Sequence, residues 1–285
     1  MTFSIYDKDY NKLEYDYLVF SGGEVQVKIK AWIGFELGTK PLLKIKGRIV
    51  SSESVIELLM LVDALRRMIP KCRLKLVSPY FPYARQDRVC YPGEAFSLKV
   101  FANLINDLNF ESVEIWDPHS EITPALLDRV EVVPQRIFVN KIFNLFSDEK
   151  LSKKNLVLVA PDVGAIKKTR EVASSVGLPF IHADKIRNPE NGNITGTKVY
   201  AEELFVGNGG YPKINKDFLI VDDICDGGRT FVELAKELRK ITVGKIYLYV
   251  THGIFSKGFE VFDGLIDHIY CANAWKYGEK MTVIA

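Results

Sequence analysis

Hydrophobic and polar residues follow two different periods in the first part of the chain. Over residues 25–29 they alternate one by one, which is the period of a half-buried strand. From Glu53 the apolar positions recur every three to four residues. This pattern predicts a helix that runs to about Met68, with Ser51 or Ser52 as its N-cap.

Short apolar runs then alternate with helical patterns to the end of the chain. The predicted strands are residues 73–78, 113–116, 156–160, 218–221 and 245–250. The predicted helices are residues 96–108, 164–175 and 230–240. Continuous apolar strands separated by helices are typical of parallel sheets that are covered on both faces. Because this layout occurs on both sides of Pro134, the sequence predicts an α/β protein with mostly parallel sheets and two domains, residues 1–135 and 136–285.

Composition excludes several classes of protein. The chain has 285 residues, of which 47% are hydrophobic and 26% charged, so neither a disordered chain nor a coiled coil is expected. The formal net charge of +2 gives no support for a nucleic acid or a membrane surface as a partner. No apolar stretch is long enough to span a membrane, and the N-terminus has acids where a signal peptide needs an apolar core. We expect a cytoplasmic protein with free cysteines.

The strongest chemical signal lies in residues 220–230. Asp222 and Asp223 follow an apolar strand, and a glycine turn then opens a helix. Backbone N–H groups at a helix start bind phosphate, and glycines let the phosphate approach them. The carboxylates can accept hydrogen bonds from sugar hydroxyls or lie near Mg²⁺. A solvated, capped turn is the alternative, but two acids, two glycines and Thr230 together favour a site for a ribose 5-phosphate group.

Three weaker polar clusters also follow predicted strands, at the sheet edge where open α/β sheets bind ligands. Arg85 and Arg88 flank Asp87 and suit a polyphosphate, although taken alone they are slightly better explained as a surface ion pair. For His119, which follows an aspartate at a strand end, a metal site and a structural role are equally favoured. Asp162, taken alone, is a solvated acid before a helix.

Residues 185–196 fit no element and are rich in Asn, Gly and Pro, which predicts a mobile loop. Lys185 and Arg187 at its start are either solvated or part of a lid that brings positive charge to a phosphoryl transition state. The phosphate-loop motif of kinases and the dinucleotide-binding glycine motif are both absent from the sequence, which disfavours those two classes.

Taken in order, these segments resemble the ribose-phosphate pyrophosphokinase family, also called phosphoribosyl pyrophosphate (PRPP) synthetase. The resemblance covers nearly the whole chain and rests on residues 20–24, 80–88, 117–119, 160–164, 184–187, 221–230 and 251–253. The sequence departs from the family in lacking its usual first strand and helix, at Gly22, and at residues 121–125 and 227–229.

The resemblance implies two phosphoribosyltransferase-like (type I) domains, Mg²⁺ as cofactor, and a homo-oligomer built from dimers. It implies transfer of the β,γ-diphosphoryl group of ATP to the 1-hydroxyl of ribose 5-phosphate, giving PRPP and AMP. The residues that it assigns to ATP are Phe20, Glu24, Arg85, Gln86, Asp87 and Arg88. Those assigned to ribose 5-phosphate are Asp222, Asp223, Asp226, Gly227, Gly228, Arg229 and Thr230. The metal residues are His119 and Asp162, and the catalytic residues are Lys185 and Arg187.

Two other functions stay open from the sequence. A salvage phosphoribosyltransferase, which consumes PRPP, has a similar phosphate loop, but the arginine cluster and the second domain argue against it. A catalytically silent subunit of a synthetase complex is expected to lose site residues, whereas Lys185, His119 and Asp222 are all present.

Overall fold

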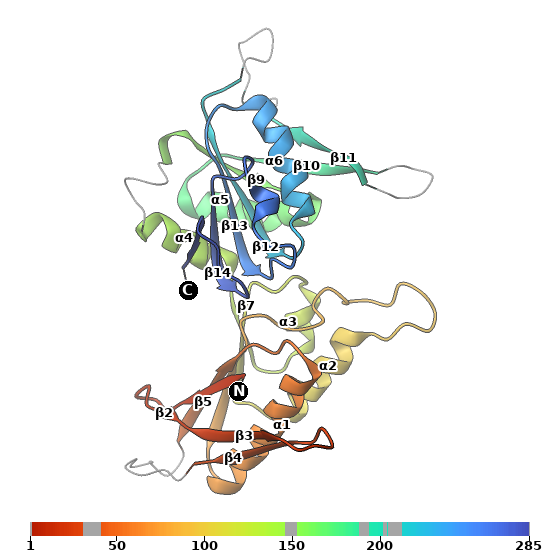
Figure 1. Ribbon diagram of the computed structural model, residues 1–285, viewed down its shortest axis with the longest axis vertical. Helices are drawn as coiled ribbons and strands as arrows, with labels where there is room; N and C mark the ends of the chain where they lie inside the picture. Colours follow the sequence, from red (N-terminus) through yellow and green to blue (C-terminus); the bar gives the residue numbers. More distant parts are fainter. Residues whose placement is uncertain are drawn as a thin grey trace. The chain divides into compact units, whose positions relative to one another are not determined.

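The computed structural model describes residues 2–30, 41–145, 153–187, 194–201, 204 and 213–284. The chain forms two compact units, Met1–Val133 (unit 1) and Pro134–Ala285 (unit 2), and each unit has its own sheet (Figure 1). Each unit is described by itself below.

Unit 1 is built on a six-stranded sheet in the order β2-β1-β5-β6-β7-β8. Strands β5 to β8 are parallel, and β1 is antiparallel to both of its neighbours. A separate hairpin of β3 and β4 packs on α1 (Figure 1). The elements are β1 (Phe3–Tyr6), β2 (Lys12–Leu13), β3 (Tyr15–Val19), β4 (Val25–Ile29), β5 (Leu42–Gly47), α1 (Ser52–Met68), β6 (Arg73–Val77), α2 (Ser97–Asp107), β7 (Ser112–Trp116), α3 (Ile122–Leu126) and β8 (Val130–Val133).

The first predicted helix is confirmed as α1, and Ser51 is its N-cap. The Ser51 hydroxyl accepts a hydrogen bond from the Ser54 N–H at 3.1 Å, and the Ser54 hydroxyl accepts one from the Ser51 N–H at 3.0 Å, which closes a capping box. Leu61 and Leu65 are fully buried beneath the helix. Burial of each such side chain stabilises the fold by about 2 kcal/mol.

Two tyrosines of β3 hold the hairpin on α1. The hydroxyl of Tyr15 donates to the buried carboxylate of Glu57 at 2.7 Å, and burial together with this bond raises the tyrosine pKa. The hydroxyl of Tyr17 donates to Glu53, which raises the pKa of Tyr17 to about 12. The start of the hairpin is thus fixed, while its turn extends beyond the helix.

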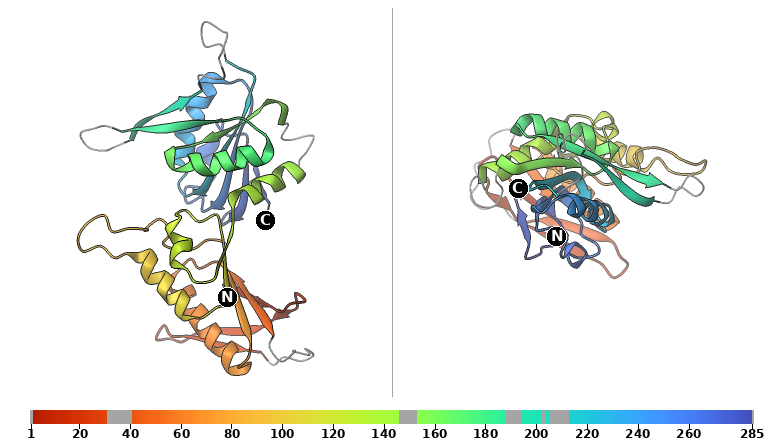
Figure 2. Two further views of the ribbon diagram at one scale, coloured as in Figure 1. Left: turned by 180° about the vertical axis from the view of Figure 1, so that it is seen from behind. Right: turned by 90° about the horizontal axis from the view of Figure 1, so that it is seen from above.

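Unit 2 has a seven-stranded sheet in the order β11-β10-β9-β12-β13-β14-β15, in which only the edge strand β11 is antiparallel among the strands described. Helices α4 and α5 lie side by side on one face, and α6 covers the other (Figures 1 and 2). The elements that carry the argument are α4 (Gln135–Leu145), β9 (Leu156–Ala160), the 3₁₀ turn η2 (Val163–Ala165), α5 (Ile166–Val176), β10 (Phe180–Arg187), β11 (Ile194–Tyr200), β12 (Asp217–Cys225), α6 (Arg229–Ile241), β13 (Ile246–Gly253), β14 (His268–Ala274) and β15 (Met281–Val283).

The fold class is confirmed: both units are α/β with mostly parallel sheets. The predicted end of one strand is wrong, because β12 continues through Cys225 and includes both acids. Its pairing with β13 continues past the apolar residues, with Asp222 opposite Val250 and Ile224 opposite His252. The apolar run of the sequence ends before Asp222, whereas the backbone pairing of β12 with β13 continues to Cys225.

The predicted loop at residues 185–196 is also partly wrong. Lys185 and Arg187 lie in β10, where Lys185 pairs with Thr197 and Arg187 with Ile194 of β11. Residues 188–193 lie outside the described part of the chain. In the part of the chain that is described, every helix is too short or too polar to cross a lipid bilayer.

Candidate active site

The carboxyl end of β12 and the start of α6 form the first part of the candidate site. The glycine loop, Asp226–Thr230, joins them. Gly228 is buried and has φ +78°, and a Cβ atom there would lie 2.6 Å from Cζ of Phe262. Both the backbone angle and the contact therefore require glycine at this position.

The glycine loop rests on the segment after β13. The N–H of Ser256 donates to the carbonyl of Asp226 at 3.1 Å, and the N–H of Ile254 donates to the carbonyl of Cys225 at 2.8 Å. Among the described contacts, the N–H groups of Arg229 and Thr230 donate to no protein acceptor, as is usual in the first turn of a helix. They are available to an anion.

The two acids of β12 lie beside this loop and are linked to a lysine. The N–H of Asp223 donates to Oδ1 of Asp222 at 2.9 Å. Nζ of Lys168, on α5, lies 3.0 Å from Oδ2 of Asp223, whose side chain is only 10% exposed. Sequence reasoning gave Lys168 no role.

A third carboxylate lies at the neighbouring strand end. Asp162 follows β9 and caps η2, where its Oδ1 accepts the N–H of Ala165 at 3.2 Å. Burial raises the pKa of Asp222 well above its ordinary value, and the charges of Asp223 and Asp162 raise it further. The site thus concentrates negative charge at the carboxyl ends of β9 and β12.

Unit 1 contains a polar cavity of about 510 Å³ next to α2. It brings together four predicted ATP residues and one predicted metal residue, although more than thirty positions separate the two groups in the sequence. These residues are Arg85, Gln86, Asp87, Arg88 and His119. Cys90, Glu94, Ala95 and Ser97 complete the lining.

Asp87 is the anchored member of this group. Its carboxylate accepts hydrogen bonds from Nε of Arg88 at 2.8 Å and from the hydroxyl of Ser120 at 2.7 Å. The arginine hydrogen bond, more than any other interaction, holds the Asp87 pKa below its ordinary value. Asp87 therefore positions Arg88, and Ser120 is a supporting residue that sequence reasoning missed.

The backbone on both sides of the polar cavity is strained. Tyr83, two residues before Arg85, has φ +61°. Asp117, two residues before His119, has φ +38° and is buried. Left-handed backbone is uncommon outside glycine, and such strain clusters at functional sites.

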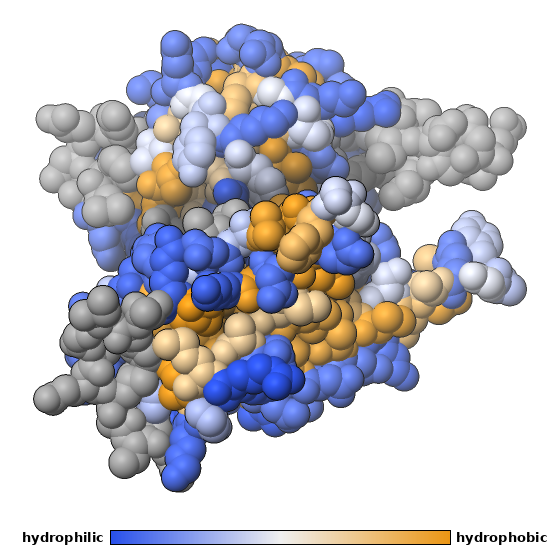
Figure 3. Space-filling view, turned by 60° about the horizontal axis from the view of Figure 1, so that its bottom comes forward, coloured by the Kyte–Doolittle hydropathy of each residue, from blue (hydrophilic) through white to orange (hydrophobic). Residues whose placement is uncertain are grey.

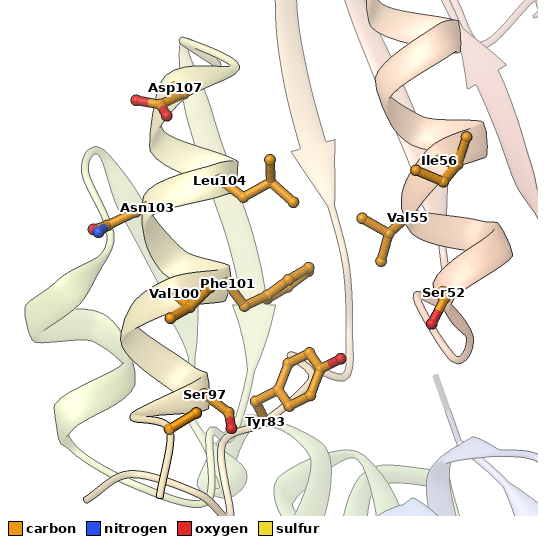
Figure 4. A pocket seen from close by; sticks show the side chains of 11 residues that line it. Ser52, Val55, Ile56, Tyr83, Ser97, Val100, Phe101, Asn103, Leu104 and Asp107 are labelled. Carbon is orange, nitrogen blue, oxygen red and sulfur yellow. The ribbon is translucent and has the colours of Figure 1, made fainter. Parts of the chain in front are cut away.

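A second cavity of about 690 Å³ lies between α1 and α2. Val55 and Ile56 on α1 face Phe101 and Leu104 on α2, and the ring of Tyr83 lies at one end of the gap (Figure 4). Two residues line both cavities: Ala95 and Ser97. The two cavities therefore adjoin at Ala95 and Ser97.

The turn of the β3–β4 hairpin carries Phe20 and Glu24. The N–H of Phe20 donates to the carbonyl of Glu24 at 2.9 Å, and the Phe20 side chain is 52% exposed. Both residues lie on an exposed turn between strands, as predicted.

The remaining predicted residues are the two metal residues and the two catalytic residues. His119 lies in unit 1 and Asp162 in unit 2, and the side chains of Lys185 and Arg187 lie outside the described part. Among the side chains that are described, no three of the His, Cys, Asp and Glu residues are grouped to hold a metal ion.

Two sequence families match the chain in the order of its units. The N-terminal domain of ribose phosphate pyrophosphokinase matches residues 13–108, and the phosphoribosyl transferase domain matches residues 132–272. A crystal structure of phosphoribosylpyrophosphate synthetase from Mycobacterium smegmatis has the same fold, with a TM-score of 0.74 and 21% identity over 96% of this chain and 87% of that one.

Curated relatives carry the name ribose-phosphate pyrophosphokinase. The protein from Mycoplasma pneumoniae is 33% identical over 78% of this chain, which spans only 65% of that relative's length. The protein from Thermococcus kodakarensis is 39% identical over 72% of this chain and 67% of the relative, and that from Pyrococcus furiosus is 30% identical over 89% and 83%. The chain therefore belongs to the ribose-phosphate pyrophosphokinase family.

Proposed function

We propose that this protein transfers the diphosphoryl group of ATP to the 1-hydroxyl of ribose 5-phosphate, giving PRPP and AMP. The observation that carries the proposal is the pair of acids on β12 beside a glycine loop that opens a helix. The relatives' name supports the same reaction.

The ribose 5-phosphate would be held entirely by unit 2. The carboxylates of Asp222 and Asp223 accept hydrogen bonds from the sugar hydroxyls. The 5-phosphate binds the N–H groups of Arg229 and Thr230 and the Thr230 hydroxyl, where the helix dipole favours an anion. Gly228, with φ +78° and no Cβ atom, lets the loop turn tightly against Phe262 into the start of α6, which carries these N–H groups.

ATP would be held by the polar cavity of unit 1. The exposed guanidinium groups of Arg85 and Arg88 bind phosphate oxygens in pairs, and Gln86 adds a neutral donor. Asp87 fixes the direction of Arg88 through the hydrogen bonds described above.

Mg²⁺ fits this assignment. It is usually bound by one or two carboxylates together with substrate phosphates, so a cage of protein ligands is not required. Each unit would offer one ligand to Mg²⁺: Asp162 a carboxylate in unit 2 and His119 an imidazole in unit 1. Bound Mg²⁺ would neutralise phosphate charge.

Lys185 and Arg187 would stabilise the charge on the migrating group. Phosphoryl transfer needs positioning and charge neutralisation more than covalent chemistry, and cations aimed at the transition state provide both. The backbone of both residues lies near the end of β10, beside residues 188–193.

The assembly would be a homo-oligomer built from dimers, with Phe20 and Glu24 completing the adenine site of a neighbouring copy. Exposed apolar side chains support this. Those in the hairpin, α1, α2 and the adjoining loop include Leu18, Val19, Phe20, Ile56, Met60, Tyr83 and Val100, and an extended apolar area is visible in Figure 3. Such exposure is typical of protein interfaces. Light scattering at assay concentration tests the assembly: a monomer with full specific activity would assign Phe20 and Glu24 to their own subunit.

Purified protein with Mg-ATP and ribose 5-phosphate, monitored for AMP, tests the reaction. AMP should appear only when ribose 5-phosphate is present. Release of pyrophosphate from PRPP and a free base would instead identify a salvage transferase, against which the match at residues 13–108 argues. No turnover with either set of substrates would indicate a silent subunit.

A further inference from the structure

A lysine of α5 extends to the acid pair from a neighbouring element. Nζ of Lys168 lies 3.0 Å from Oδ2 of Asp223, and Asp223 in turn donates its N–H to the carboxylate of Asp222. Lys168 thus reaches the Asp223 side chain from α5, while the Asp222 carboxylate is held by the backbone of β12. The charge of Lys168 also acts on Asp222, whose pKa it lowers against the larger effect of burial. Asp223 is 10% exposed and Lys168 28% exposed, so water screens their attraction only partly.

Lys168 lies near the start of α5. The 3₁₀ turn η2, capped by Asp162, leads directly into α5, and Lys168 is the third residue of α5. α5 packs on β9 and β10, and β9 pairs with β12, so a lysine at this end of the helix can extend to the acids of β12. The ion pair with Asp223 is formed from this position.

The charges around the pair explain why a cation is needed. Asp222, Asp223 and Asp162 lie close enough to repel one another, and this repulsion contributes to the raised pKa of Asp222. A buried carboxylate without a partner is costly. Loss of the Lys168 ammonium would remove a cation in contact with the Asp223 carboxylate and leave the repulsion among the acids less compensated.

We propose that Lys168 is a positioning residue that holds the Asp223 carboxylate, beside Asp222, in the arrangement that binds the sugar hydroxyls. The proposal rests on the proposed function, because it takes ribose 5-phosphate as the ligand of the pair. Lys168 acts through Asp223 and not by contact with the reacting atoms. Its removal should therefore affect sugar binding more than nucleotide binding or the rate of the saturated enzyme.

The test compares Lys168→Met with Lys168→Arg and with Lys236→Met. Lys236 forms an exposed ion pair with Glu233 on α6 and so controls for the loss of one lysine and one ion pair. Calorimetry measures the Kd of ribose 5-phosphate and of a non-hydrolysable ATP analogue separately, steady-state kinetics give KM and kcat, and Tm reports folding. Lys168→Gln is the second variant if Lys168→Met does not fold.

Lys168→Met should weaken ribose 5-phosphate binding at least ~10-fold, as expected when one partner of a partly buried charge pair is removed. ATP-analogue binding should change less than about 2-fold, Lys168→Arg should recover most of the sugar affinity, and Lys236→Met should match the wild type. Unchanged sugar affinity in a folded Lys168→Met protein would overturn the proposal. So would an equal loss for both ligands together with a lower Tm, which marks a structural lysine. Failure of the wild type to bind ribose 5-phosphate would overturn the proposed function itself, and this inference with it.

Discussion

The two loops that would bind the substrates are built in opposite ways. In the glycine loop of unit 2, Gly228 is buried. Asp223, which precedes the loop on β12, forms hydrogen bonds with Lys168 and Asp222. In the arginine loop of unit 1, defined as residues 85–88, the long side chains of Arg85 and Arg88 are exposed. Asp87 alone among these four residues has a mostly buried side chain.

The glycine loop therefore depends on the backbone conformation that the fold imposes, whereas the arginine loop depends on exposed side chains. The glycine loop has its backbone fixed by Phe262 and Ser256, so a substitution there disturbs packing as well as binding. The arginine loop can lose a side chain with little effect on the core. We therefore expect changes in unit 2 to affect stability and sugar binding together, and changes in unit 1 to affect mainly nucleotide binding.

The largest effect is expected from neither loop. Lys185→Ala should lower kcat by ~10³-fold or more, because one charge aimed at a transition state contributes several kcal/mol. Ribose 5-phosphate binding should be nearly unchanged, since the residues proposed to bind the sugar lie on β12 and at the start of α6 and not on β10. Pre-steady-state kinetics and calorimetry measure the two quantities. An unchanged kcat with a raised KM would make the lysine a binding residue only.

The next effect separates the two substrates. Asp222→Asn and Asp223→Asn should each weaken ribose 5-phosphate binding by ~10–10²-fold, because a charged acceptor contributes roughly 1.5–3 kcal/mol to a hydrogen bond. Binding of an ATP analogue should survive. Calorimetry with each ligand alone makes the comparison, and Arg85→Met is the matched variant in unit 1, with the opposite selectivity. Equal loss of both ligands in a folded protein would assign the acids to the nucleotide or its metal.

Stability distinguishes two glycines with similar backbone angles. Gly228 and Gly93 have φ values of +78° and +91°, but only at Gly228 would a Cβ atom collide with a neighbour. Gly228→Ala should lower the free energy of unfolding by about 2–4 kcal/mol, from strain and overlap together, and Gly93→Ala by about 1 kcal/mol, from strain alone. Urea unfolding measures both. Equal losses would show that the glycine loop can move away from Phe262.

The smallest effect concerns pH, where the two regions should respond with opposite sign. The pKa of Asp87 is lowered, so its contribution to stability is present above the ordinary value of 3.8 and is lost as the pH falls through the lowered pKa. The pKa of Asp222 is raised, so a destabilising contribution begins as the pH rises above 3.8 and is complete above the raised pKa. At pH 7, Asp222→Asn should therefore raise Tm by about 2–4 °C, whereas Asp87→Asn should lower it by a similar amount or less. Thermal unfolding of both variants at pH 7 and pH 4 is the measurement, and a fall in Tm for Asp222→Asn at pH 7 would contradict the assignment.

The sequence predicted the helices and strands that have a regular hydrophobic period. It did not predict strand ends that are set by backbone pairing with another strand. α1 and its cap at Ser51 follow from local pattern and local hydrogen bonds. The extension of β12 through Asp222 depends on backbone bonds to β13, and the strand at Lys185 depends on β11. Hydropathy identified β13 as a strand, but it does not show how far the pairing extends, because Asp222, Asp223 and Lys185 are polar.

For the candidate site, too, local signals could be read from the sequence and contacts between distant segments could not. The strand-end acids and the glycine loop are local signals, whereas the meeting of His119 with Arg85 depends on parallel β6 and β7 lying side by side. Lys168 was visible in the sequence but carried no signal by itself. Its place beside Asp223 depends on the packing of α5 on β9 and β10, next to β12, which no local pattern reveals.

The most direct test of the central claim is the fate of the phosphates. ³¹P NMR of the wild-type protein with Mg-ATP and ribose 5-phosphate follows every phosphorus atom through the reaction. The proposed reaction predicts AMP and a ribose 5-phosphate with a diphosphate on its 1-hydroxyl, formed in equal amounts, and loss of both products in Asp222→Asn at the same sugar concentration. ADP as the nucleotide product, with a single phosphate on the sugar, would contradict it.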